Sequence, residues 1–138
     1  MSNRTLVSKS QDWRRIRSPF RSANEAQIAG LLEHQGIIYL YEHPVVVVDQ
    51  GKSRLWYPDF QLPQYGVIIE YCGMPEVPEY FAGMKKKDQV YRDNGLTALL
   101  VTPDDMKGFW PGRLFGQIEA ILRDRLDSFL ERTSRTIG

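Results

Sequence analysis

The sequence contains very little cysteine and histidine. Among its 138 residues there is one cysteine, Cys72, and there are two histidines, His34 and His43. A single cysteine excludes an internal disulfide framework and is typical of a protein from a reducing compartment. One cysteine and two histidines are also too few to build a structural zinc site. The length is that of one domain with a hydrophobic core of its own.

Long hydrophobic runs and common nucleotide-binding motifs are missing as well. No apolar run reaches the length of a membrane span, and the first residues lack the apolar region of a signal peptide. We therefore expect a soluble cytoplasmic protein with no membrane partner. The sequence also has no glycine-rich phosphate loop, no Gly-x-Ser-x-Gly elbow and no dinucleotide fingerprint.

The net charge is only +1, but its distribution is uneven. The first 22 residues carry a net charge of +5, so the remaining 116 residues sum to −4. We divide the chain into a basic N-terminal arm, residues 1–19, and an α/β domain, residues 20–138. A basic arm is either a solvated tail or a contact for nucleic-acid phosphates. The candidate nucleic-acid contacts are Arg14, Arg15, Arg17, Arg21, Lys85 and Lys86.

The hydrophobic pattern predicts alternating helices and strands. Ser22 and Glu25 have the spacing of a capping box, which predicts a helix that begins at Ser22 and ends at Gly36. The further predicted elements are strands at 37–48 (with a bend at Pro44), 54–62, 67–72 and 96–102, and helices at 79–94 and 111–132. This order, αβββαβα, contains hairpins and a strand–helix–strand crossover. It therefore predicts a mixed central sheet flanked by helices.

The most informative feature is a pair of carboxylates, Asp59 and Glu70. If residues 63–66 form the loop of a hairpin, Leu62 pairs with Val67 and Asp59 lies directly opposite Glu70. Opposed side chains share one face of a sheet, with Cβ atoms about 5 Å apart. Two like charges at that distance repel, and a divalent cation with oxygen ligands would neutralise them. The alternative is a charged edge hairpin that faces water.

The surroundings of Glu70 favour the metal interpretation. Glu70 lies within the apolar strand predicted at 67–72, where a carboxylate without a partner costs stability. Glu25 is a third candidate, which would reach the hairpin through a metal-bound water. The capping box by itself explains Glu25 completely. Trp56 could stack on nucleic-acid bases, but we expect it in the core because it lies in a predicted strand.

The motifs Tyr57-Pro-Asp-Phe60 and Ile69-Glu-Tyr-Cys-Gly73 resemble the signature of the PD-(D/E)XK nucleases. The order of a helix with Glu, a strand with Pro-Asp and a strand with Glu is similar to that family over residues 20–105. The resemblance implies a restriction-endonuclease-like fold, with an αβββαβ core and an added C-terminal helix. It also implies hydrolysis of DNA phosphodiester bonds, by an endonuclease of the resolvase, nicking or transposon-end type that often acts as a homodimer.

The resemblance further implies a metal site. Asp59, Glu70 and the backbone carbonyl of Tyr71 would bind Mg2+, for which Mn2+ could substitute, and Glu25 would assist through water. The family usually has lysine two residues after the glutamate, where this chain has Cys72. Lys87, one helical turn before Tyr91, is the favoured replacement, and Lys52 and Arg54 are weaker ones.

The sequence is also compatible with two other functions. Cys72 would suit a catalytically inactive nucleic-acid-binding module that keeps the nuclease fold, because a neutral thiol supplies no positive charge. An interaction protein unrelated to nucleic acid is the third possibility. It requires the predicted pairing of Asp59 with Glu70 to be wrong.

Overall fold

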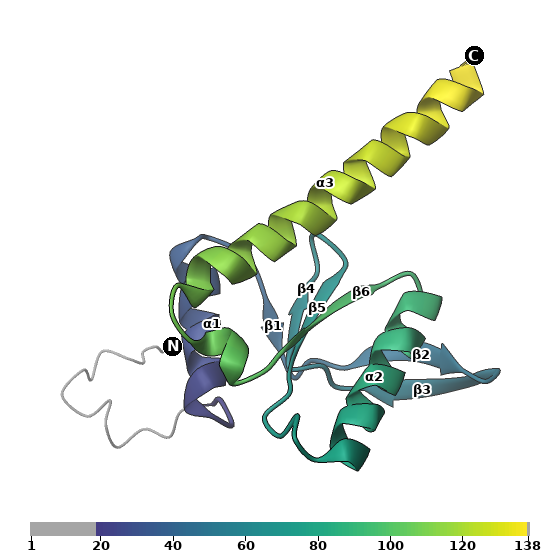
Figure 1. The fold of residues 1–138 in the computed structure, drawn as a ribbon. Helices are drawn as coiled ribbons and strands as arrows, with labels where there is room; N and C mark the ends of the chain where they lie inside the picture. The colour runs from purple at the N-terminus through teal and green to yellow at the C-terminus, as the bar shows by residue number, and fades with distance from the viewer. Residues whose placement is uncertain (1–18, 138) are drawn as a thin grey trace, which may run out of the picture.

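The computed structural model describes residues 19–137, and the side chains as far as residue 135 (Figure 1). The elements are α1 (Ala23–His34), β1 (Leu40–Tyr41), β2 (Val45–Asp49), β3 (Lys52–Trp56), β4 (Phe60–Leu62), β5 (Val67–Tyr71), α2 (Pro78–Asp93), β6 (Thr97–Val101), the short 3-10 helix η2 (Asp104–Met106) and α3 (Trp110–Ile137). Nearly all of the basic arm predicted at residues 1–19 lies outside the described residues, including Arg14, Arg15 and Arg17.

The first helix begins and ends where the sequence predicts. Ser22 is the N-cap of α1, and its Oγ accepts a hydrogen bond from the backbone N–H of Glu25 at 3.1 Å. The helix ends at His34, and Gly36 adopts a positive φ of 69° that an L side chain rarely tolerates. The capping box therefore fixes the position of Glu25 along the chain.

The main sheet is mixed, as predicted. Its strand order is β1-β4-β5-β6, with antiparallel pairing of β1 with β4 and of β4 with β5, and parallel pairing of β5 with β6 (Figure 1). Leu62 pairs with Val67 and Phe60 pairs with Ile69, which is the predicted register. The crossover from β5 to β6 passes through α2. The structure is thus a single α/β domain with a mixed sheet and three α-helices over residues 19–137.

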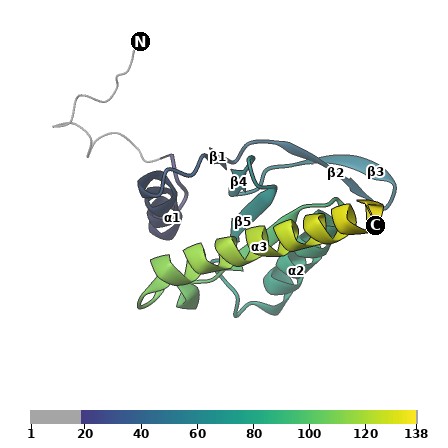
Figure 2. The same ribbon diagram turned by 90° about the horizontal axis from the view of Figure 1, so that it is seen from above.

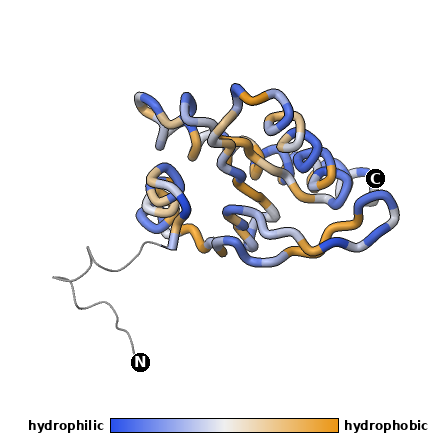
Figure 3. Tube along the Cα trace, turned by 90° about the horizontal axis from the view of Figure 1, so that it is seen from below, coloured by the Kyte–Doolittle hydropathy of each residue, from blue (hydrophilic) through white to orange (hydrophobic). Residues whose placement is uncertain are grey.

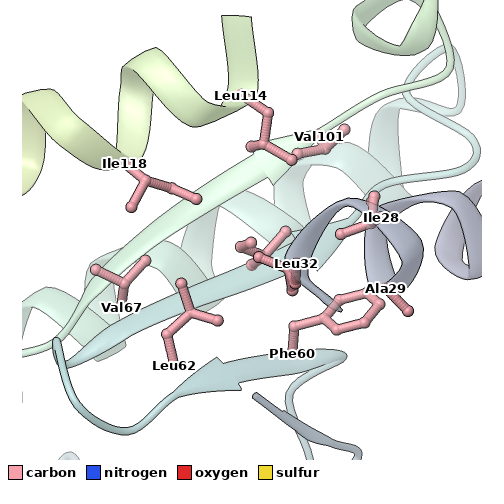
Figure 4. Close-up of a cluster of buried hydrophobic side chains, with 10 residues drawn as sticks. Ile28, Ala29, Leu32, Phe60, Leu62, Val67, Val101, Leu114 and Ile118 are labelled. Carbon is pink, nitrogen blue, oxygen red and sulfur yellow. The ribbon is translucent and has the colours of Figure 1, made fainter. Parts of the chain in front are cut away.

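One face of the main sheet carries the larger hydrophobic core. Side chains from β4, β5 and β6 meet those of α1 and of the N-terminal part of α3 on this face (Figure 4). Full burial of an aliphatic or aromatic side chain stabilises a fold by about 1.5–3 kcal/mol. The buried members of this core are Ile28, Ala29, Leu32, Phe60, Leu62, Val67, Ile69, Val101, Leu114 and Ile118.

A smaller core covers the opposite face of the sheet. Because side chains alternate along a strand, Ile68 and Glu70 of β5 point away from the larger core. Ile68 packs with Val47 of β2 and with Val90 and Tyr91 of α2. The β2–β3 hairpin and α2 therefore enclose the face on which Glu70 lies.

The prediction of two long strands at 37–48 and 54–62 is wrong. The first stretch forms β1 and β2, and the second forms β3 and β4. In each stretch one strand (β1 or β4) belongs to the main sheet and the other (β2 or β3) to the two-stranded sheet. Glu42, between β1 and β2, has a positive φ of 52°, and Pro44 and Pro58 have no N–H to donate to a ladder. At these two points the chain leaves the main sheet and returns, so residues 45–56 form a separate hairpin.

The hairpin of β2 and β3 has an apolar inner side and a polar turn. Val47 pairs with Arg54 and is fully buried, and Val45 pairs with Trp56. Figure 3 shows the hydrophobic stretch of β2 giving way to hydrophilic residues at the tip of the hairpin. The turn contains Gly51 with a positive φ of 77°.

The last helix is longer than the predicted range 111–132. It spans Trp110–Ile137, and Figures 1 and 2 show its first part over the main sheet and its last part extending past the sheet. Arg125 fixes the helix to the β4–β5 turn, because its guanidinium donates to the carbonyl of Gly66 at 3.0 Å and to Thr97 Oγ1 at 2.8 Å. Within residues 19–137, none of the helices combines the length and the hydropathy that crossing a membrane requires.

Asn94 joins the hairpin to the end of α2. Its Oδ1 accepts a hydrogen bond from the backbone N–H of Val48 at 2.9 Å, and its Nδ2 donates to the carbonyl of Val48 at 3.0 Å. Nδ2 also donates to the carbonyl of Val90 at 2.7 Å. The amide thus acts as a strand partner for β2 and as a cap for α2.

We expect the Asn94→Ala variant to lose about 1–3 kcal/mol of free energy of unfolding, because it leaves the N–H and the carbonyl of Val48 without their amide partner. The matched control is Gln89→Ala, which removes one exposed hydrogen bond to Asp93 on the same helix and should cost less than about 0.5 kcal/mol. Urea unfolding followed by circular dichroism measures both. Equal losses would show that Asn94 does not attach the hairpin.

Candidate active site

Glu70 is the centre of a buried polar cluster on the α2 side of the sheet. It lies in β5 and is 2% exposed. Its Oε2 is 3.3 Å from the Lys87 ammonium and accepts a hydrogen bond from the Tyr91 hydroxyl at 2.8 Å. Its Oε1 accepts a hydrogen bond from the backbone N–H of Asp59 at 3.2 Å. A carboxylate in an apolar strand is therefore paired at both oxygens.

Asp59 lies beside Glu70, at the point where the chain enters β4. It follows the fully buried Pro58 and is itself half-buried. Its Oδ2 accepts a hydrogen bond from the backbone N–H of Tyr71 at 2.7 Å. Each carboxylate thus binds a backbone N–H of the other strand. The ladder that follows keeps the predicted register, so the prediction that Asp59 and Glu70 meet across the hairpin is supported, with Asp59 one residue before β4 begins.

Burial and like charge raise the pKa of Asp59. Desolvation and the neighbouring Glu70 carboxylate bring this pKa from 3.8 to about 7, with a smaller contribution from Glu25. The hydrogen bond from Tyr71 and the positive charge of Lys87 act in the opposite direction. A carboxyl that ionises near neutral pH beside a second carboxylate is typical of a functional site.

Among the described side chains, Lys87 is the only one of the three predicted α2 lysines that contacts Glu70. Besides Glu70, its ammonium lies over the ring of Trp56, 5.9 Å from the ring centroid. The Trp56 ring in turn packs edge-on against Tyr91, with 5.4 Å between the centroids. The pKa of Tyr91 is raised by burial and by the Glu70 carboxylate, so its hydroxyl remains a donor.

Sequence reasoning did not assign Trp56 or Tyr91 to the site. The spacing of Lys87 and Tyr91 was the available signal, because residues four apart lie on the same face of a helix. Trp56 was expected in the core, and it is partly buried against Ile68 and Tyr91 as well as contacting Lys87. The contact of Trp56 with Lys87 depends on the docking of the hairpin on α2, and this docking leaves no local pattern in the sequence.

Glu25 is buried near Asp59 but its oxygens have other partners. It is 6% exposed, and its Oε1 accepts a hydrogen bond from the Tyr41 hydroxyl at 2.6 Å. Its Oε2 accepts one from Ser22 Oγ at 3.1 Å. Burial and this hydrogen bond raise the pKa of Tyr41. Glu25 thus influences Asp59 through charge, while α1 and β1 hold its carboxylate.

Among the described side chains, the remaining candidates form no hydrogen bond or ion pair with Asp59 or Glu70. Cys72 is fully buried, and desolvation raises the pKa of its thiol, which therefore stays neutral. Lys85 lies over the Phe81 ring on α2, with 5.3 Å between the ammonium and the centroid, and Lys86 is exposed. Arg21 is exposed and forms an ion pair with Glu42.

The donors present fit a cation that takes only a few ligands from the protein. Within residues 19–137, no group of three or more His, Cys, Asp and Glu side chains is placed to hold a metal ion together. Asp59 and Glu70 form a pair of adjacent carboxylates, and Asp59 reaches solvent. Mg2+ commonly binds through one or two carboxylates and keeps water or substrate phosphate as its other ligands. The pair matches this pattern and does not match an all-protein cage.

The raised pKa of Asp59 predicts a loss of stability with rising pH. Unfolded Asp59 releases its proton near pH 3.8, whereas the folded protein retains it to about pH 7. Between these values the folded state binds more protons, so the free energy of unfolding falls as pH rises and levels off above pH 7. For a partly solvated group we expect a contribution of about 1–2 kcal/mol.

Asp59→Asn should remove this contribution, so that the variant is as stable as the wild type near pH 4 and more stable at pH 8. Asparagine keeps an acceptor for the Tyr71 N–H. Urea unfolding at several pH values measures the effect. Asp104→Asn is the control, because the Asp104 side chain is 86% exposed and should leave the pH dependence unchanged. Parallel pH curves for wild type and Asp59→Asn would contradict the assignment.

Comparison with known proteins adds no family to these observations. No protein-family model matches the sequence, and no curated protein is significantly similar to it.

Proposed function

We propose that this protein is a Mg2+-dependent endonuclease that hydrolyses DNA phosphodiester bonds. The observation that carries the proposal is the contact of Lys87 with Glu70 at 3.3 Å, beside Asp59. An aspartate, a glutamate and a lysine are the charged groups of the PD-(D/E)XK signature that the sequence resembles. Lys87 reaches Glu70 from α2, in place of a lysine at position 72.

The lysine has the properties that phosphate chemistry requires. Its side chain is 37% exposed while that of Glu70 is 2% exposed, so the ammonium stands between the buried carboxylate and solvent. An ammonium has three N–H donors, and contact with one carboxylate oxygen leaves donors for a phosphate oxygen. Positive charge at that position stabilises the negative charge that develops on phosphorus during hydrolysis.

Asp59 and Glu70 would hold the ion, with the backbone carbonyl of Tyr71 as a further ligand implied by the resemblance. When bound, Mg2+ supplies an acidified water and positive charge beside the phosphate. Tyr91 and the Asp59 N–H fix the orientation of the Glu70 carboxylate before substrate arrives. Glu25, held by Tyr41 and Ser22, adds negative charge nearby and favours cation binding.

DNA would be bound mainly by positive charge outside the carboxylate pair. Lys85 and Lys86 are exposed on α2, the helix that carries Lys87, and Arg21 is exposed before α1. Residues 1–18 add a net charge of +4. Phosphate contacts of this kind give affinity without sequence preference. Cleavage of both strands of a duplex would require two sites, which a homodimer provides.

Incubation of supercoiled plasmid with the protein and Mg2+ or Mn2+ tests the proposal. We expect nicked or linear product from the wild type. Asp59→Asn, Glu70→Gln and Lys87→Ala should each lower the rate by about 100-fold or more, because each removes charge that acts in the transition state. Gel electrophoresis over a time course measures the rates.

Lys107→Ala is the matched control for the loss of a surface cation. Lys107 pairs with the exposed Asp104 in η2 and lies outside the carboxylate cluster, so its loss should change the rate by less than about two-fold. Undiminished cleavage by Asp59→Asn would exclude this site. Undiminished cleavage by Lys87→Ala would exclude Lys87 as the replacement lysine.

A catalytically inactive nucleic-acid-binding module is the second candidate. The observation that favours it is Cys72, a buried neutral thiol where the resembled signature has lysine. The two candidates differ in their need for a cation. A module without catalysis has no use for a metal at Asp59 and Glu70.

Calorimetric titration with Mn2+ separates the two candidates. For the nuclease we expect one saturable site that is lost in Glu70→Gln, because the variant removes a charged ligand. Glu119→Gln, which changes an exposed carboxylate on α3, should bind Mn2+ like the wild type. Absence of binding in the wild type would favour the module.

A further inference from the structure

The β2–β3 hairpin brings the side chain of Trp56 to the groups that bind Glu70. The indole contacts both groups that bind Glu70 Oε2: it lies 5.9 Å from the Lys87 ammonium and 5.4 Å from the Tyr91 ring. The lysine and the tyrosine approach that oxygen to 3.3 Å and 2.8 Å. Trp56, Lys87 and Tyr91 therefore form one contiguous group around a single carboxylate oxygen.

The Lys87 side chain needs a second contact, besides its ion pair with Glu70, to keep its ammonium in place. Its side chain has four rotatable bonds and is partly exposed, so an unrestrained ammonium would spend much of its time in solvent. One ion pair with a carboxylate restrains only the end of the chain. An aromatic face within about 6 Å of the ammonium attracts the charge and also limits the rotamers of the stem.

The indole is itself firmly placed. Trp56 pairs with Val45 in the hairpin, and its ring packs against the core formed by Val47 and Ile68. The hairpin is attached to α2 a second time, by the Asn94 amide at Val48. The ring is thus fixed by β2, by Ile68 of β5 and by the attachment of the hairpin to the end of α2.

We propose that Trp56 is a positioning residue, which holds the Lys87 ammonium against Glu70 and thereby sets the rate of the reaction proposed above. It acts through Lys87 and does not touch substrate. The role of Trp56 in the reaction rests on the proposed function, whereas its hold on Lys87 does not. The β2–β3 hairpin, which has no other assigned role, would thus serve to place Trp56 beside Lys87.

The first test measures the contact without relying on activity. An ammonium stem that lies over an indole face has its ε-methylene proton resonance shifted upfield by the ring current. We expect this shift for Lys87 in the wild-type NMR spectrum, its retention in Trp56→Phe and its loss in Trp56→Leu. Lys87→Gln identifies the resonance. A Lys87 ε-methylene at the ordinary exposed-lysine position in the wild type would overturn the proposal, and this measurement needs no variant of Trp56 to fold.

The second test uses single-turnover cleavage and steady-state kinetics. Trp56→Leu should lower kcat by about 10- to 100-fold with little change in KM, because a misplaced ammonium loses transition-state contacts. Trp56→Phe, which keeps an aromatic face, should restore most of the rate. Leu55→Ala is the control for the hairpin, because Leu55 is 53% exposed on its outer side. Its rate should match the wild type.

A double-variant cycle distinguishes support of Lys87 from support of the fold. In the Lys87→Gln background, Trp56→Leu should cause no further loss of rate, because there is no ammonium left to hold. An equal loss in both backgrounds would overturn the proposal. If the wild type shows the ring-current shift but cleaves no DNA, the proposed function fails, while the hold of Trp56 on Lys87 is supported.

Discussion

The burial of the Glu70 carboxylate is the constraint on which the rest of the site depends. A carboxylate that is 2% exposed in an apolar strand would be costly without partners. Three groups from two elements supply them: the backbone N–H of Asp59, the Tyr91 hydroxyl and the Lys87 ammonium. The β4–β5 hairpin and α2 must therefore dock together for this strand to be buried, so the polar cluster is also a requirement of the fold.

The same arrangement leaves Asp59 electrostatically unsatisfied. Tyr71 donates one hydrogen bond to it, but desolvation and the Glu70 carboxylate dominate and raise its pKa to about 7. The negative charge of Glu25, whose carboxylate is held by Tyr41, raises the pKa of Asp59 further. A fold seldom keeps such a pair for stability alone. Neutralisation by a divalent cation is the chemistry that relieves it most directly, and this is the physical basis of the proposed nuclease function.

Local patterns predicted several elements because their causes are local. Ser22 caps α1 because a hydroxyl oxygen accepts from an N–H three residues along the chain. The connection at 63–66 sets the register of β4 and β5, since a short loop leaves few pairings. The sequence pattern predicts one strand across Pro44 and one across Pro58, and both predictions are wrong. A run rich in Val, Ile and Tyr indicates a strand but not the sheet to which the strand belongs. That choice depends on packing against α2, which is distant in the sequence.

The sequence by itself determined that Asp59 and Glu70 meet, because strand alternation and one turn suffice to bring them together. It also named Lys87 as a candidate, but three successive lysines turn about 100° apart around a helix axis, and only the docking of α2 decides which of them faces Glu70. Tertiary structure likewise decided that Trp56 of a second sheet lies over that lysine and that Tyr41 holds Glu25. These contacts join segments far apart in the chain, so no periodicity or spacing encodes them.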